Sequence, residues 1–188
     1  MIHELLVKER SYRSFDPSVT VSNETLFSFL ENVRLTPSTR NLQALKFKVC
    51  TEKADLDAML GFTGWAKSLS IELPPKGHEP VAYIIICLDT SIASADIMYR
   101  DVGIAAQTIM LSAVEAGLGG CMIGSFVPEV LSEYFAFPEH IVPKLVLGLG
   151  KPDEVCVAED SVDGNVTYYR DDENVHHVPK RTLEEILL

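Results

Sequence analysis

A long apolar segment from Ser94 to Ala116 limits most strongly how this chain can fold. We predict one helix there, and its second half has almost no polar face. The apolar residues of that half are Val102, Ile104, Ala105, Ala106, Ile109, Met110, Leu111, Ala113 and Val114. A helix that is apolar on all sides is buried, either in the core of a domain or between subunits. Gly103 would allow close packing against it, and Gly117 is well placed to end it.

Shorter elements surround this helix, and together they predict a single domain over residues 1–188. The length suffices for one full hydrophobic core. Residues 81–88 are apolar at both odd and even positions, which indicates a strand covered on both faces. Other strands are expected at 45–49, 121–125, 144–149 and 166–169, and other helices at 2–9, after the cap Ser22, and at 51–60, 128–135 and 182–187. The alternation of strands and helices by itself suggests a parallel, doubly wound sheet.

Residues 64–80 are irregular, because Pro74, Pro75 and Pro80 interrupt regular structure. The segment also contains Trp65, the single tryptophan of the chain. A proline-rich loop of this length is either a functional lid or binding loop, or a surface excursion. Both interpretations stay open at this point.

The charge of the chain excludes one class of partner. The net charge is −11 at pH 7, and the pI is about 4.8. The excess is concentrated between Asp153 and Glu173, where we interpret it as a solubilising surface. Such a surface repels nucleic acid, so an anionic ligand needs a local basic cluster. Because no apolar run reaches the roughly 18 residues of a membrane span and residues 1–4 are no basic signal region, we expect a cytoplasmic protein without nucleic-acid or membrane partners.

The cysteine and histidine patterns do not predict a metal site. The four cysteines stand more than thirty residues apart and form no C-x-x-C pair: Cys50, Cys87, Cys121 and Cys156. We expect reduced, buried thiols rather than disulfides. The pair His176-His177 could ligate a metal, but a histidine pair alone is a weak signal, and we predict no metal.

Two glycine clusters suggest a nucleotide-binding loop, but neither completes the G-x-G-x-x-G pattern. The first, 117–120, lies between a helix and a strand, which is the reverse of the required order. The second, 148–150, follows a strand but leads into Lys151-Pro152. We interpret both as turn glycines. Since no Ser-His-Asp or Cys-His arrangement is found either, a cofactor should supply any difficult chemistry.

Two polar segments carry the functional signal. Arg10-Ser11-Tyr12-Arg13 puts two guanidinium groups beside a serine, after a short helix. Pro37-Ser38-Thr39-Arg40-Asn41-Leu42-Gln43 offers hydroxyl and carboxamide groups in a loop. Paired guanidinium groups and hydroxyls suit a phosphomonoester, because charge-assisted bidentate hydrogen bonds are strong. Together the two segments could hold a phosphate and the polar edge of a flat heterocycle.

In order and spacing these segments resemble the flavin-binding signature of the nitroreductase family. The resemblance continues through the long apolar helix, Gly117–Phe126, Leu147–Pro152 and the late basic pair Lys180-Arg181. It implies an α+β fold of three layers, with a mixed, mainly antiparallel sheet flanked by helices, in a homodimer that binds FMN. We follow it rather than the parallel sheet, because periodicity does not fix strand direction.

The resemblance implies a cofactor site shared between two subunits. Three early residues would contact the phosphate, the ribityl chain and the pyrimidine edge: Arg10, Ser11 and Arg13. Two late basic residues would join them on the phosphate: Lys180 and Arg181. Four residues of the other subunit would line the opposite edge of the ring: Pro37, Ser38, Thr39 and Asn41. One loop would offer backbone groups near the flavin N5: Met122, Ile123, Gly124 and Ser125.

The same resemblance implies an NAD(P)H oxidoreductase, in which flavin N5 rather than a side chain carries the chemistry. NADH or NADPH would reduce the flavin, and a nitroaromatic, a quinone or a similar electron-poor acceptor would then take two electrons by a ping-pong mechanism. Two alternatives stay open: an FMN enzyme of another type, such as a reductive dehalogenase or an enzyme acting on flavin itself, and a flavin-binding module with little turnover.

The chain departs from the family pattern at two places. Ala44-Leu45 stands where relatives commonly have Pro-Trp, and Arg40 stands where a small residue is usual. Both departures bear on the acceptor pocket rather than on FMN binding. The acceptor and the choice between NADH and NADPH are open from the sequence.

Overall fold

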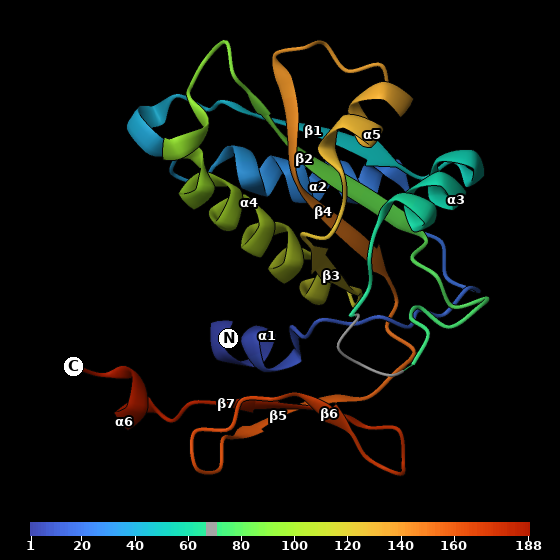
Figure 1. Ribbon diagram of the computed structural model, residues 1–188, viewed down its shortest axis with the longest axis vertical. Coiled ribbons are helices and arrows are strands. Elements are labelled where there is room, and N and C mark those ends of the chain that lie inside the picture. The colour runs from blue at the N-terminus through green and yellow to red at the C-terminus, as the bar shows by residue number, and fades with distance from the viewer. Residues whose placement is uncertain (67–70) are drawn as a thin grey trace.

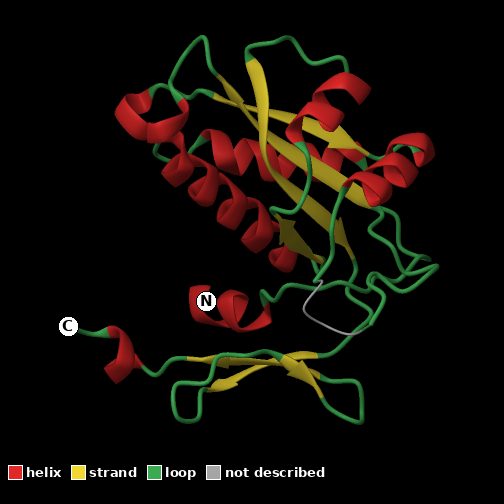
Figure 2. Ribbon diagram, in the orientation of Figure 1, coloured by secondary structure: helices red, strands yellow, loops and turns green. Residues whose placement is uncertain are grey.

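The computed structural model describes residues 1–66 and 71–188. In this part of the chain the strands form two sheets (Figures 1 and 2). The larger sheet has the order β1-β2-β4-β3, with β1 (Leu45–Cys50), β2 (Ala82–Asp89), β3 (Gly119–Ile123) and β4 (Ile141–Gly150). Neighbouring strands in it are antiparallel. The antiparallel sheet implied by the resemblance is therefore confirmed, and the parallel sheet suggested by the alternation is wrong.

The smaller sheet forms a layer of its own below the first helix (Figure 1). It has the order β5-β7-β6, with β5 (Cys156–Asp160), β6 (Tyr169–Arg170) and β7 (His176–Lys180). β5 runs parallel to β7, and β6 runs antiparallel to it. This sheet brings the C-terminal part of the chain close to the N-terminal helix.

Helices cover both faces of the larger sheet (Figure 2). The helices of the described part of the chain are α1 (Ile2–Lys8), α2 (Asn23–Arg34), α3 (Lys53–Phe62), α4 (Ala95–Glu115), α5 (Pro128–Tyr134) and α6 (Leu183–Ile186), with a 3₁₀ helix η1 (Thr39–Asn41). α2 and α4 pack on one face of the sheet, and α3 and α5 pack on the other. The described part of the chain contains no helix long and apolar enough to cross a membrane.

β2 is the centre of the core, and every residue in it is buried. Alternate side chains of a strand point to opposite faces. Ala82, Ile84 and Ile86 accordingly pack toward α2 and α4, and Tyr83 and Ile85 pack toward α3 and α5. The run that is apolar at both odd and even positions thus forms a strand covered on both faces, as expected.

The local signals placed α2 correctly. The Ser22 side chain accepts a hydrogen bond from the backbone N–H of Thr25 at 3.1 Å, as an N-cap does. Leu26, Phe29 and Val33 form the buried side of the helix. Spacing and cap together therefore determined this element.

Other boundaries differ from expectation. The helix expected at 51–60 runs from Lys53 to Phe62, and the strand expected at 121–125 runs from Gly119 to Ile123. The edge strand expected at 166–169 is reduced to β6, which has two residues. β5 and β7 were not expected at all, because they are short and polar. β7 also contains Pro179, a residue that usually argues against a central strand.

The interpretation of the glycine clusters as turn glycines is wrong for most of their members. Gly119 and Gly120 lie in β3, and Gly148 and Gly150 lie in β4. A Cβ added to Gly120 would stand 2.4 Å from the carbonyl oxygen of Gly148. One added to Gly150 would stand 2.9 Å from the Phe15 ring. These glycines therefore allow close packing between strands and against the segment after α1.

Trp65 is a core residue, with 8% of its surface exposed. Its indole N–H donates to Oγ1 of Thr63 at 3.1 Å, and its ring packs near Gly148. It therefore lies inside the subunit, away from the pockets described below. Residues 67–70 of the segment considered as a lid lie outside the described residues.

The cysteines are free thiols, and three of the four are buried. Burial raises the pKa of Cys50, Cys87 and Cys156 to about 12, so these thiols are protonated at neutral pH. They belong to the packing of the molecule, as the sequence suggested.

Candidate functional site

A pocket of about 240 Å³ brings together four residues that were predicted to bind FMN through its phosphate, ribityl chain or pyrimidine edge. Its lining residues are Glu9, Arg10, Ser11, Arg13, Tyr168, His176, Val178 and Lys180. Two arginines and one lysine meet there in a protein whose net charge is −11. The pocket is thus the local basic cluster that an anionic ligand would need.

Backbone contacts with the larger sheet fix the first wall of the pocket. Ser11 forms a parallel bridge with Gly120 of β3, and the Tyr12 N–H donates to the carbonyl oxygen of Gly120 at 2.9 Å. Four residues later, Phe15 is fully buried and bridges to Pro152. The segment that carries Arg10 and Arg13 is therefore held at both ends.

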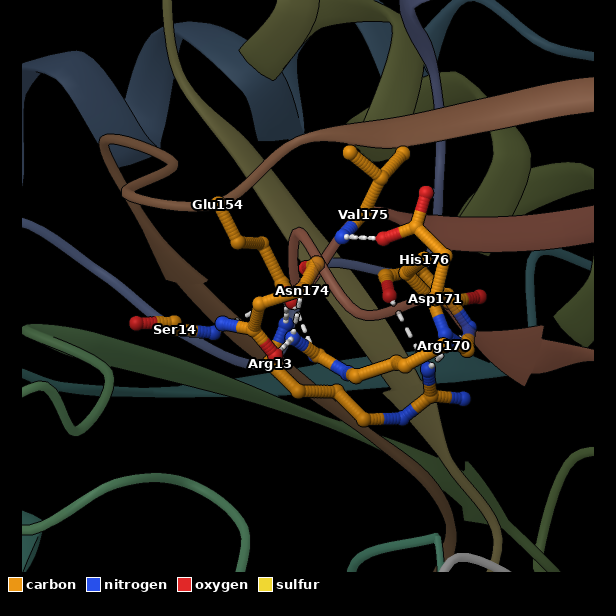
Figure 3. A network of polar contacts seen from close by, with 9 residues as sticks. Arg13, Ser14, Glu154, Arg170, Asp171, Asn174, Val175 and His176 are labelled. Carbon is orange, nitrogen blue, oxygen red and sulfur yellow. Dashed lines mark hydrogen bonds and ion pairs between the residues drawn. The ribbon is translucent and has the colours of Figure 1, made fainter.

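Glu154 anchors the same segment through its side chain (Figure 3). Its carboxylate accepts hydrogen bonds from the backbone N–H groups of Arg13 and Ser14, the latter at 3.1 Å. The carboxylate also pairs with the Arg170 guanidinium of β6. The two side chains are 3% and 12% exposed. Glu154 is thus a buried structural charge, and its assignment to a solvated acidic surface was wrong.

The Arg13 side chain is oriented by aromatic neighbours from the smaller sheet. Its Nη1 lies 3.4 Å from Nε2 of His176, and its guanidinium lies over the Tyr168 ring at 5.8 Å from the centroid. A cation over an aromatic face is attracted by the ring quadrupole. The Tyr168 ring in turn meets the His176 ring edge-on. These contacts hold Arg13 at the pocket without neutralising its charge.

Two buried polar atoms beside the pocket have no hydrogen-bond partner among the described residues. They are Nε of Arg10 and Nδ1 of His176. Arg10 donates through Nη2 to the carbonyl oxygen of Leu6 at 2.6 Å, which leaves its other N–H groups for a ligand. Unpaired buried donors beside a basic cluster fit a bound anion, because buried polar groups are normally hydrogen-bonded. The donor set therefore fits the phosphate of FMN.

β7 forms the opposite wall of the pocket. His176, Val178 and Lys180 line it and stand two residues apart, so they share one face of the strand. The neighbouring Arg181 does not line the pocket. It is half exposed and lies 3.6 Å from Glu185. Of the late basic pair, the structure brings only Lys180 to the arginines.

The two adjacent histidines have opposite environments. Burial lowers the pKa of His176, and the positive charges of Arg13 and Arg170 lower it further. His177, on the other face of β7, lies 3.0 Å from Asp171 and 2.8 Å from Glu159. Hydrogen bonds with these two carboxylates raise the pKa of His177. The histidines therefore do not share a ligand, and the described residues form no group of three potential metal ligands.

The residues predicted for the other edge of the ring lie at the far end of α4. Both the backbone N–H and Oγ1 of Thr39 donate to the Asp101 carboxylate, at 3.0 and 2.8 Å. Asp101 is 4% exposed and near the start of α4, whereas α1 and the basic pocket lie toward the other end (Figure 1). The helix rises about 21 Å between Asp101 and Glu115. The two halves of the predicted site do not meet within one subunit.

A second pocket, of about 440 Å³, lies at this far end between α2, β1 and α4. Pro37 and Ser38 line it, and so do Ala44 and Leu45, the pair that departs from the family pattern. Its other walls combine apolar side chains of α2, β1 and α4 with polar ones, among them Glu31, Gln43 and Asp101. Neither Thr39 nor Asn41 lines it, and the Arg40 side chain is exposed.

The loop after β3 reaches neither pocket. Ile123 is buried in the core, and Met122 is 36% exposed. Gly124 and Ser125 are exposed, and the Ser125 carbonyl accepts a hydrogen bond from the Gly64 N–H at 2.7 Å. The side chains of this loop thus make no site of their own, and only its backbone groups remain for the predicted role.

Sequence reasoning missed three residues around the basic pocket: Glu154, Tyr168 and His176. Nothing in the local sequence separates Glu154 from the acidic residues around it. For His176 a signal existed, since the alternation His176-x-Val178-x-Lys180 places an imidazole on the same strand face as a predicted phosphate ligand.

Comparison with known families gives one match over most of the chain. The profile described as "Nitroreductase family" matches residues 6–151. A curated relative from Methanothermobacter thermautotrophicus, provisionally named NADH dehydrogenase/NAD(P)H nitroreductase, is 38% identical over 89 residues. The match covers 45% of this chain and 46% of that relative, so it spans about half the length of each protein.

Solved structures extend the likeness to the whole chain. A nitroreductase family protein from Streptococcus pneumoniae TIGR4 has a TM-score of 0.73 at 18% identity, with 100% of this chain and 99% of that chain covered. An FMN-dependent nitroreductase from Clostridium difficile R20291 has a TM-score of 0.70 at 24% identity, with 91% and 99% covered. At these identities the likeness concerns the fold, including the smaller sheet that lies beyond residue 151.

Proposed function

We propose a function from the premise that this chain belongs to the nitroreductase family: it is an FMN-dependent oxidoreductase that transfers two electrons from NADH or NADPH to a small electron-poor acceptor. One observation carries the proposal. Arg10, Ser11, Arg13 and Lys180 converge on one pocket beside two unpaired buried N–H groups. This donor set is suited to a single terminal phosphate.

The residues of the pocket would bind the cofactor chiefly through its phosphate. The guanidinium groups of Arg10 and Arg13 supply planar, permanently charged donors, and Ser11 supplies a hydroxyl. Lys180 adds a cation from the opposite wall. Bound FMN would supply the redox chemistry, with hydride accepted and released at its N5. The protein's share is to position the ring and to exclude competing reactions.

The proposed site is completed by a second copy of the chain. Pro37, Ser38, Thr39 and Asn41 lie far from the basic pocket of their own subunit, and a partner could bring the same loop to it. The carboxylate of Asp101 holds that loop in shape through Thr39. The backbone of residues 122–125, at the end of β3 and directly after it, would face the reacting edge of the ring.

One side of α4 supports dimer formation. Its inner side is buried against the sheet, but an outer strip with apolar residues is left partly open: Gly103, Ile104, Gln107, Thr108 and Leu111. The apolar residues of α6 and the following tail are exposed as well, for example Leu183 at 67% and Ile186 at 62%. Accessible apolar residues on α4 and at the C-terminal end are suited to burial against a second subunit.

We expect the purified protein to be a homodimer, because both the strip on α4 and the divided cofactor site require a second copy. Light scattering at micromolar concentration should give about twice the 20.8 kDa mass of the chain. A stable monomer that carries FMN in full would contradict the shared site.

We expect the protein to be yellow, to release FMN rather than FAD on denaturation, and to be bleached anaerobically by NADH or NADPH before any acceptor is added.

If donor and acceptor use the same flavin face in turn, double-reciprocal plots at several acceptor concentrations should be parallel. The absence of a dinucleotide fingerprint in the sequence motivates this ping-pong scheme.

The outcomes of this experiment separate the alternatives. Intersecting lines would replace the ping-pong scheme with a ternary complex. Bound FMN that neither nicotinamide reduces would favour the flavin-binding module. Reduction by nicotinamide without turnover of quinones or nitroaromatics would favour another reaction type, such as dehalogenation. A colourless protein that does not bind added FMN would refute the proposal altogether.

A further inference from the structure

His176 is a pocket residue that the flavin-binding signature did not assign. It comes from β7, lines the basic pocket beside Arg13 and Lys180, and is 2% exposed. A histidine buried this deeply is ordinarily satisfied by neighbouring groups. This one is satisfied on one side only.

The two ring nitrogens can be assigned from their surroundings. Nε2 lies 3.4 Å from Nη1 of Arg13. A guanidinium only donates hydrogen bonds and does not lose its proton in a protein, so Nε2 must be the acceptor. In a neutral imidazole the proton is then on Nδ1. That atom is buried and has no partner among the described residues, so the Nδ1–H is an unpaired hydrogen-bond donor.

Charged groups surround the ring from each element packed against it. Arg13 comes from the segment after α1, Arg170 from β6, and Glu154 from the turn before β5, while His177 follows on β7. The Tyr168 ring meets the imidazole edge-on, with 5.4 Å between centroids. Burial and the two guanidinium groups lower the pKa of His176, which agrees with a neutral ring.

We propose that His176 determines cofactor specificity in this pocket: it fixes the Arg13 guanidinium through Nε2 and offers its Nδ1–H to the phosphate group of the cofactor. The proposal rests on the proposed function and deepens it, because it assigns to this residue the preference for FMN over riboflavin, which has the same ring but no phosphate.

A phosphate in the pocket also changes the charge that the imidazole experiences. The anion offsets the positive charges of Arg13 and Arg170, and the protonated imidazole becomes more favourable than in the empty pocket. Protonation would, however, turn Nε2 from an acceptor into a donor that faces the Arg13 guanidinium. This residue's contribution to FMN affinity is therefore largest where the imidazole is neutral, and it declines as the pH falls through the pKa of the bound imidazole. Riboflavin binding should lack this contribution.

The test is a titration of the flavin-free protein with FMN and, separately, with riboflavin, followed by flavin fluorescence at several pH values. His176→Gln keeps an acceptor near the Nε2 position but lacks the Nδ1 donor, and His176→Asn does the reverse. We expect each variant to weaken FMN binding by about tenfold and riboflavin binding by less than about twofold, since one charge-assisted hydrogen bond is lost. The phosphate titrates as well, so the pH effect is read as the difference between wild type and variant.

His177→Gln is the matched control. It changes the neighbouring residue on the opposite face of β7, where the imidazole contacts Glu159 and Asp171. It should lower thermal stability but leave the ratio of the FMN and riboflavin affinities unchanged. If His177→Gln changed the ratio of the FMN and riboflavin affinities as much as the His176 variants do, His176 would have only a structural role.

The result can separate the inference from the proposed function. If wild type binds FMN more tightly than riboflavin and both His176 variants keep that preference, the inference fails and the function stands. A wild-type protein that binds FMN and riboflavin equally would also overturn it. If wild type binds no FMN, both fail together. Should one variant not fold, the other still decides the question.

Discussion

The double variant Arg10→Ala/Arg13→Ala should lose FMN affinity by about a hundredfold or more, and each single variant by at least about tenfold. A hydrogen bond to a charged group contributes about 1.5–3 kcal/mol, and 1.4 kcal/mol corresponds to a factor of ten. Both arginines line the pocket, and Arg10 has an unpaired buried Nε. Equilibrium titration of the flavin-free variants with FMN measures the loss.

Lys53→Ala serves as the charge-matched control, because it also removes a cation. Lys53 is 83% exposed on α3 and pairs only with Asp57 among the described residues, so its loss should leave FMN affinity within a fewfold. Cys50→Ala and Cys87→Ala should behave in the same way, since both thiols are buried in the core. If a cysteine variant abolished flavin binding while the double arginine variant kept it, the assignment of the site would be wrong.

Glu154→Gln should lower the free energy of unfolding by about 3–5 kcal/mol, which is the usual effect of removing one partner from a buried ion pair. The Arg170 guanidinium would stay buried at 12% exposure without its carboxylate. The substitution also weakens the hydrogen bonds that the backbone N–H groups of Arg13 and Ser14 donate. Urea unfolding of the flavin-free protein measures the change.

Glu129→Gln, a carboxylate in the first turn of α5 that is not buried, is the comparison. It should change stability by less than about 0.5 kcal/mol, as surface substitutions usually do. Adding Arg170→Gln to Glu154→Gln should cause less than the sum of the two single losses, because the partners interact directly. An unchanged urea midpoint for Glu154→Gln would show that the segment is held by the sheet contacts alone.

The parts of the fold that were predicted correctly depend on local rules. Ser22 and the spacing of Leu26, Phe29 and Val33 determine α2 without reference to the rest of the chain. The run 81–88 could only be a strand covered on both faces. Strand direction has no such local signal, because a strand reads the same in a parallel and an antiparallel sheet. The family resemblance, not periodicity, gave the correct arrangement.

Part of the candidate site could be predicted from the sequence. Arg10, Ser11, Arg13 and Lys180 were identified from their types and their order along the chain, and the structure brings them to one pocket. Arg181 was assigned to the phosphate together with Lys180 because both match the late basic residues of the family. β7 ends at Lys180, however, and Arg181 lies beyond the strand beside Glu185, so only Lys180 lies on the strand face that lines the pocket.

The sequence by itself determined the elements that depend on local signals, namely the capped helices and the central strand. It also determined which chemistry the two polar segments can carry. Only the tertiary structure decided that Glu154 is a buried anchor, that His176 is a pocket wall, and that the loop at Thr39 lies away from the basic pocket. The first two facts depend on contacts of Arg13 with residues more than a hundred positions away, and the third depends on the contact between Thr39 and Asp101, which are 62 positions apart. Burial and charge environment are properties of such contacts, so no window of sequence contains them.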